Sequence, residues 1–170
     1  GDTAYGVTSG QYIRDSLPLM RSYIIDSCGE INLTGEHYLL NDLNAGATSP
    51  CIIIKGTGIT LNLNRYTITN SNNGPTILVN GSTNTIIHNG NINGGALSEL
   101  GPVYALNSNS VSLRNIILNN MNCNDENCAA VYTNNSSLNF VNTQFNSIVR
   151  PIYSNGSVTF TNLTICNSTE

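Results

Sequence analysis

Residues 111–118 read VSLRNIIL, residues 138–145 read LNFVNTQF and residues 158–165 read VTFTNLTI. Each octapeptide has apolar residues at its first, third and last positions and Asn at its fifth. Two further copies are nearly regular: residues 85–92 (TIIHNGNI) begin with Thr, and residues 61–68 (LNLNRYTI) have Arg in place of the Asn. Alternation of apolar and polar residues predicts a strand with one buried face. The Asn predicts a corner after that strand, because Asn tolerates left-handed backbone.

The octapeptide belongs to a longer repeat. Its segments start at Pro50, Pro75, Pro102, Ala129 and Pro151, each with a short apolar run and then a polar turn. A unit of this size cannot bury its own apolar face, so successive units must stack. The sequence therefore predicts an all-β fold, a right-handed parallel β-helix (a solenoid) of about 5–6 coils. The alternative is an antiparallel β-sandwich, because the several Asn-Gly pairs are typical of hairpins.

Three stretches resemble the coils of a known family. These are ITLNLNRYTITNSNNG (residues 59–74), ILVNGSTNTIIHNGNINGG (residues 77–95) and CGEINLTGEHYLLNDL (residues 28–43). They are similar to the coil repeat and entry coil of pectate-lyase-like right-handed parallel β-helix proteins. The resemblance extends over about residues 28–168. It implies the fold and no single function, because this fold hosts enzymes, adhesins, spikes and structural proteins.

The two ends of the chain differ from the repeats. We expect residues 1–27 to form an arm and a short capping helix, and residues 28–170 to form the parallel β-helix. The helix is predicted over residues 11–25 from near-helical spacing of apolar residues such as Leu17 and Met20. No amphipathic segment follows Ile165 to cap the last coil. We therefore expect head-to-tail self-association, with a truncated chain or a frayed last coil shielded by glycan and polar residues as the alternatives.

Repeated asparagines at one corner predict a ladder of side-chain amides. In stacked coils, equivalent residues lie above one another, and an amide can both donate and accept a hydrogen bond. The predicted ladder consists of Asn89, Asn115, Asn142 and Asn162.

Charged side chains make up only 9% of the chain, against about 25% in ordinary globular domains. Six Lys and Arg residues in a chain of net charge −4 are too few for a nucleic-acid partner. No apolar run is long enough to span a membrane. We expect no cofactor and no metal site, since the acidic pair Asp125–Glu126 is best read as a solvated loop tip.

The sequence also offers no evident set of catalytic side chains. The charged residues from position 50 onward offer no two carboxylates at equivalent places, whereas glycoside hydrolysis needs a carboxyl pair. The two histidines, His37 and His88, have no evident partners in the sequence. We therefore expect no enzymatic activity.

Five cysteines suggest an oxidising compartment. We predict disulfides Cys28–Cys51 and Cys123–Cys128, with Cys166 left over. The chain begins without Met or a leader, as expected of a mature extracellular protein. The sequons are candidate N-glycosylation sites at Asn32, Asn80, Asn134, Asn135, Asn155, Asn162 and Asn167.

These features together predict a non-enzymatic extracellular structural glycoprotein at a cell or particle surface. Its subunits would stack head to tail into a filament or surface fibre. One alternative is a carbohydrate-binding or adhesin module, with Tyr104, Tyr132 and Tyr153 either as a sugar-stacking face or as strand packing. A polysaccharide lyase or hydrolase is the remaining alternative.

Overall fold

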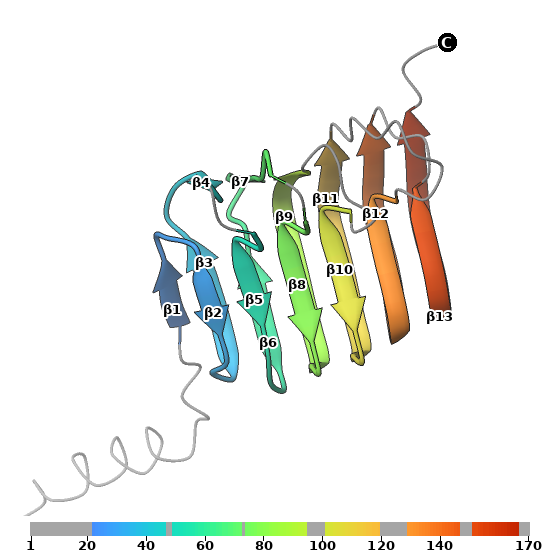
Figure 1. Ribbon diagram of the computed structural model, residues 1–170, viewed down its shortest axis with the longest axis horizontal. Helices are drawn as coiled ribbons and strands as arrows, with labels where there is room; N and C mark the ends of the chain where they lie inside the picture. The colour runs from blue at the N-terminus through green and yellow to red at the C-terminus, as the bar shows by residue number, and fades with distance from the viewer. Residues whose placement is uncertain are drawn as a thin grey trace, which may run out of the picture.

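The computed structural model describes residues 22–46, 49–72, 74–94, 101–119, 129–146 and 151–166. Within these ranges the protein is a parallel β-solenoid whose thirteen strands belong to one continuous sheet. The strands are stacked in chain order along the long axis of the molecule (Figure 1). They are β1 (Ser22–Ile25), β2 (Gly29–Ile31), β3 (Gly35–Leu39), β4 (Leu43–Asn44), β5 (Ile52–Ile54), β6 (Ile59–Asn62), β7 (Thr67–Thr69), β8 (Ile77–Asn80), β9 (Thr83–Asn93), β10 (Val103–Leu106), β11 (Asn109–Asn119), β12 (Val131–Asn146) and β13 (Ile152–Cys166).

The sheet winds through three faces. The first face contains β2, β5, β8, β10 and the opening residues of β12 and β13. The second face contains β1, β3, β6, β9, β11 and the middle of β12 and β13. The third face contains β4, β7 and the closing residues of the four long strands β9, β11, β12 and β13. All strand pairings within the described ranges are parallel, which excludes the antiparallel sandwich there.

The solenoid has about four turns, fewer than the five to six coils predicted. In four coils the strands pair with the preceding coil on one side and with the following coil on the other. These coils contain β5–β7, β8–β9, β10–β11 and β12. The rows at the two ends account for the difference. Strands β2 and β4 pair on one side only, as does β13.

The expected capping helix is not seen in the described residues. Residues 11–21 lie outside them, and residues 22–25 form β1, which pairs in parallel with β3. The part of the chain that the structure describes contains no helix, and so none long and apolar enough to cross a membrane. The apolar residues near position 24 therefore belong to a strand, in which Ile24 points outward and Ile25 packs against the core.

The repeated apolar positions form the core. In residues 111–118 and 138–145, the first, third and last residues of the octapeptide are all buried. The corresponding residues of β13 behave differently: Val158 is half-buried, whereas Phe160 and Ile165 are 48% and 49% exposed. These side chains occupy inward positions, but in the described residues β13 has a neighbour on one side only.

Glycine is required at one close approach between coils. A Cβ on Gly101 would overlap the backbone carbonyl of Ala129 in the next coil. The adjoining residues Pro102 and Ala130 are buried. The absence of a side chain at position 101 thus lets β10 and β12 stack at the normal strand spacing.

Candidate functional site

The second face carries a row of polar side chains that point outward from four neighbouring strands. Tyr38 on β3 is in register with Asn62 on β6, Asn62 with His88 on β9, and His88 with Arg114 on β11. Their strand neighbours His37, Leu61, Ile87 and Leu113 are buried, because alternate residues of a strand face opposite sides. At the usual strand spacing the row spans about 14 Å along the solenoid axis.

Glu36 adds a carboxylate to this row. It lies two residues before Tyr38 on the same outward side of β3. Its Oε1 atom is 3.9 Å from Nε2 of His88, and the two side chains are 33% and 19% exposed. His88 therefore has an acidic partner, contrary to the expectation of an isolated histidine. An ion pair forms whenever the imidazole is protonated.

The phenol of Tyr38 is affected by the same carboxylate. Its hydrogen bond with Glu36 raises the pKa of Tyr38 above the ordinary value of 10.0, and desolvation and the negative charge of Glu36 act in the same direction. A hydrogen bond with Ser22 acts in the opposite direction. The phenol of Tyr38, the first member of the row, thus stays neutral to a higher pH than an ordinary tyrosine.

A ladder of amides runs along the corner between the second and third faces. The Nδ2 atom of Asn115 donates to Oδ1 of Asn89 (3.2 Å), Asn142 donates to Asn115 (3.1 Å), and Asn162 donates to Asn142 (3.0 Å). All four residues have left-handed backbone, with φ between 49° and 61°. The corner and the ladder have one cause, because Asn satisfies both the backbone conformation and the hydrogen bonds.

A second amide ladder, which the sequence interpretation missed, lies on the third face. Asn146 donates to Asn119 (2.8 Å), Asn119 to Asn93 (3.2 Å) and Asn93 to the hydroxyl of Thr69 (3.5 Å). The signal was present, since Asn directly follows the last apolar residue of three octapeptides. Side chains in both ladders have fixed orientations before any ligand arrives.

A groove lies beside the corner ladder and next to the polar row of the second face. Its volume is about 440 Å³, within the range of small-molecule sites. Asn62 belongs both to the row and to the groove. Arg65, which occupies the corner position of its coil with φ 70°, contributes a cation. The side chains that line it are mostly amides: Asn62, Asn64, Arg65, Asn89, Asn91 and Asn115.

The first face offers less to a ligand. The rings of Tyr132 and Tyr153 are stacked at 4.8 Å with an interplanar angle of 12°, and Tyr104 meets Tyr132 edge to face at 5.1 Å. Tyr132 and Tyr153 therefore cover one face of each other's ring, as expected for strand packing. A second groove of about 550 Å³ lies at the corner between the first and second faces, and its lining is uncharged: Asn107, Ser108, Asn109, Asn135, Ser136 and Ser137 among others.

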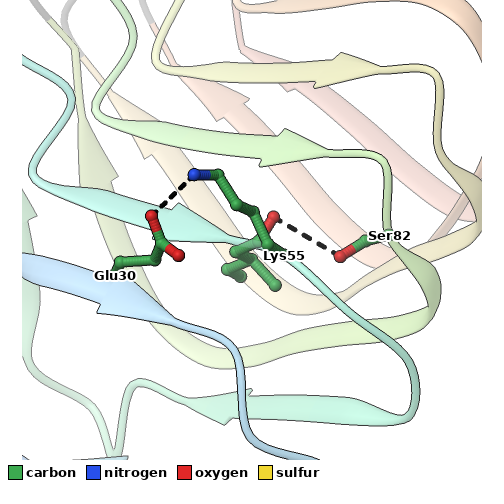
Figure 2. Close-up of polar contacts among 4 residues, drawn as sticks. Glu30, Lys55 and Ser82 are labelled. Atoms are coloured by element: carbon green, nitrogen blue, oxygen red, sulfur yellow. Dashed lines mark hydrogen bonds and ion pairs between the residues drawn. The ribbon is translucent and has the colours of Figure 1, made fainter.

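Two interactions hold the first face near its beginning. Figure 2 shows the ion pair between Nζ of Lys55 and Oε2 of Glu30, at 2.7 Å, and the bond from the Ser82 hydroxyl to the carbonyl of Ile54, at 3.4 Å. Ser82 is one of three buried serines at equivalent positions. The backbone N–H of Ser82 donates to Oγ of Ser108, and that of Ser108 to Oγ of Ser136. These groups are used within the fold.

The cysteines divide into three cases. Cys28 and Cys51 form the predicted disulfide, which joins the first two coils. Cys166 is a free, exposed thiol. Cys123, Cys128 and the acidic pair Asp125–Glu126 lie outside the described residues. The disulfide is typical of proteins from oxidising compartments.

N-glycosylation at the sequons stays a prediction. The side chains of Asn32, Asn135, Asn155 and Asn162 are exposed, those of Asn80 and Asn134 are half-buried, and Asn167 lies outside the described residues. Asn135 donates to Asn107, and Asn162 donates to Asn142 in the corner ladder. Among the described residues no group of three His, Cys, Asp or Glu side chains could hold a metal ion.

No protein-family model matches the chain. No curated protein sequence matches it either. A solved structure described as "a putative glycosyl hydrolase from Parabacteroides merdae ATCC 43184" matches with a TM-score of 0.47 and 10% sequence identity, covering 96% of this chain and 89% of the other.

The expectation of a non-enzymatic structural filament subunit is corrected. The finding that stands against it is the description of the matched structure as "a putative glycosyl hydrolase". The physical premise was also incomplete, because it considered only the carboxylates from position 50 onward, and Glu36 lies before that position. A parallel β-solenoid is compatible with both enzymes and non-enzymes.

Proposed function

We propose that this protein is an extracellular carbohydrate-binding β-solenoid of the pectate-lyase-like kind. The amide-lined groove, continuous with the polar row on the second face, supports this proposal. Sugars are recognised mainly by hydrogen bonds, and amides present donors and acceptors together. The ladders hold Asn89 and Asn115 in place, so little side-chain entropy is lost when a glycan binds.

The proposed orientation of the glycan follows from the row. A chain lying along the solenoid axis would meet Tyr38, Asn62, His88 and Arg114 in turn, one from each strand. The groove at the corner would hold the adjoining sugar. The stacked tyrosines of the first face have no part in this arrangement, because Tyr132 and Tyr153 pack on each other.

A glycan panel tests the proposal. We expect the whole chain to bind at least one oligosaccharide, and the double variant Asn62→Ala/Asn91→Ala to bind it about tenfold more weakly as two hydrogen-bonding side chains are lost. Asn139→Ala, also on the second face but outside the groove, is the matched control. Absence of binding to every glycan, or equal binding by the groove variant, would overturn the proposal.

Cleavage of the bound glycan is a second candidate, favoured by the contact between Glu36 and His88. A carboxylate beside an imidazole can exchange a proton with a bound sugar, and the neutral phenol of Tyr38 is a further hydrogen-bond donor on the same face. If the site is catalytic, new reducing ends or unsaturated sugars should appear from a polysaccharide. Glu36→Gln and His88→Gln should each abolish them, and Glu36→Gln should do so while leaving glycan binding in place.

A further inference from the structure

Asn–Gly pairs carry a chemistry of their own. The main-chain nitrogen of the glycine can attack Cγ of the asparagine side chain, because glycine has no Cβ to hinder the approach. A new C–N bond forms, the Cγ–Nδ2 bond breaks, and ammonia leaves with the proton of the glycine N–H, which closes a five-membered cyclic imide. Water then opens the imide at one of its two carbonyl carbons and leaves aspartate or isoaspartate. Four such pairs lie within the described ranges, and they differ in how they are held.

Two of the pairs are restrained by the amide ladders. Oδ1 of Asn89 accepts a hydrogen bond from Asn115 in the corner ladder, and Asn89 has left-handed backbone with φ 61°. Asn93 accepts from Asn119 and donates to the hydroxyl of Thr69 in the second ladder. Each side chain must leave its ladder before its Cγ can meet the following nitrogen, and each broken hydrogen bond raises the barrier to the reaction.

The other two pairs differ from each other in their exposure and hydrogen bonds. The N–H of Gly81 donates to the carbonyl of Leu106 at 2.9 Å, and the side chain of Asn80 is half-buried. The nitrogen of Gly81 must therefore give up a hydrogen bond before it can act as a nucleophile. Asn155 is exposed and makes no side-chain hydrogen bond within the described ranges. Its strand, β13, also pairs on one side only among the described residues.

A bulge in β12 lies opposite the bond between Asn155 and Gly156. Asn134 is in register with Asn155, and Ser136 is in register with Gly156, so Asn135 has no counterpart in β13. Isoaspartate carries the main chain through Cβ and Cγ and thus lengthens it by one carbon atom. Because β12 is already one residue longer at this level, the longer backbone of β13 can be taken up where the register changes.

Packing requires the glycine of this pair. A Cβ on Gly156 would overlap the carbonyl oxygen of Ser136. The reactive dipeptide is therefore present because the fold needs glycine at this place. Both of its residues also line the groove of about 550 Å³ between the first and second faces, and all the residues of that lining are uncharged. Conversion of Asn155 would place a carboxylate in a groove that has none.

We propose that Asn155 deamidates spontaneously in the folded protein, and that isoaspartate at this position is accommodated by the bulge of β12. The reaction consumes only water and releases ammonia, so it needs no cofactor and no second enzyme. It adds one negative charge to each converted chain and places that charge in the uncharged groove. The inference is independent of the proposed carbohydrate binding.

Ageing of the purified whole chain tests the proposal. Production in a bacterial host keeps the sequon at Asn155 without an N-glycan, so Nδ2 remains a leaving group. Peptide mass mapping after incubation in mildly alkaline buffer should show conversion at Asn155 about tenfold faster than at the other three described pairs, because those pairs must first break a hydrogen bond. Labelling by an isoaspartyl methyltransferase should identify isoaspartate at position 155.

Two controls and two contrary outcomes complete the test. In urea, where no pair is held, the four asparagines should convert at similar rates. Asn155→Gln, whose imide would need a six-membered ring, should show no conversion at position 155. Conversion at Asn155 that is no faster than at the other pairs of the folded protein would overturn the assignment of the site. Aged chain that contains isoaspartate and unfolds at a clearly lower urea concentration than fresh chain would overturn the accommodation by the bulge.

Discussion

The Nε2 atom of His88 lies 3.9 Å from Oε1 of Glu36, although β6 runs between the strands that carry them. The contact joins the first coil of the solenoid to the third. It depends on outward side chains that lean toward each other over a neutral strand. This relationship converts a histidine that looks isolated in the sequence into one end of a carboxyl–imidazole pair.

Replacing Glu36 should change the titration of Tyr38. Because the hydrogen bond with Glu36 raises the pKa of Tyr38, Glu36→Gln should bring that pKa down toward 10.0. The neutral phenol is favoured in the folded state, so its contribution to stability is present below the unfolded-state pKa and is lost as pH rises through the higher folded-state pKa. NMR titration of the Tyr38 ring measures the shift. An unchanged titration in Glu36→Gln would contradict this assignment.

Removing one amide from the corner ladder should destabilise the solenoid. Asn115 both donates to Asn89 and accepts from Asn142, and its φ is 51°. Asn115→Ala should cost about 2 kcal/mol in free energy of unfolding, since it loses the bonds and places Ala in left-handed backbone. Asn115→Gly should cost about half as much, because glycine tolerates that conformation. Urea unfolding measures both, and equal losses would show that backbone conformation is not involved.

A methyl group at position 101 should disrupt the stacking of β10 on β12. The Cβ of Gly101→Ala would overlap the carbonyl of Ala129, a backbone atom that cannot turn away. We expect a loss of about 2 kcal/mol or more in free energy of unfolding. Gly29→Ala is the control, because a Cβ there meets nothing within 4 Å. A Gly101→Ala protein as stable as Gly29→Ala would show that the coils can separate locally.

The cysteines should differ in reactivity. Cys166 is exposed and free, whereas Cys28 and Cys51 are bonded to each other. A thiol reagent applied to the folded, unreduced protein should modify Cys166 and leave Cys28 and Cys51 unmodified, as peptide mass mapping would show. The double variant Cys28→Ser/Cys51→Ser should lose about 3 kcal/mol of stability, given the length of the closed loop. Modification of Cys28 without reductant would contradict the disulfide.

Self-association stays a prediction from the sequence, and β13 gives it a specific test. Phe160 and Ile165 are 48% and 49% exposed in the described structure. If a second copy covers them, sedimentation velocity should show concentration-dependent association, and Phe160→Ser should weaken it. Asn139→Ser, an outward change one strand away, serves as the comparison. A monomer at all concentrations, for both proteins, would end this hypothesis.

The repeat pattern was enough to predict the fold because it is a local signal copied five times. The inward places of Val111, Leu113 and Leu118 follow from alternation along a strand, and the corner at Asn115 follows from the backbone preference of Asn. The disulfide between Cys28 and Cys51 could also be proposed from spacing. The prediction of a capping helix was wrong for residues 22–25, because the spacing of a few apolar residues fits both a helix and a strand. Pairing with β3 makes this segment a strand.

The sequence by itself determined a parallel solenoid, its buried positions and one ladder of asparagines, because each is fixed by residues within a single repeat. Only the tertiary structure decided which outward side chains meet. The coils differ in length, so the register between strands sets whether Glu36 reaches His88 and whether His88 lies opposite Arg114. The proposed site is made of residues from separate coils, and their proximity depends on that stacking rather than on any local pattern.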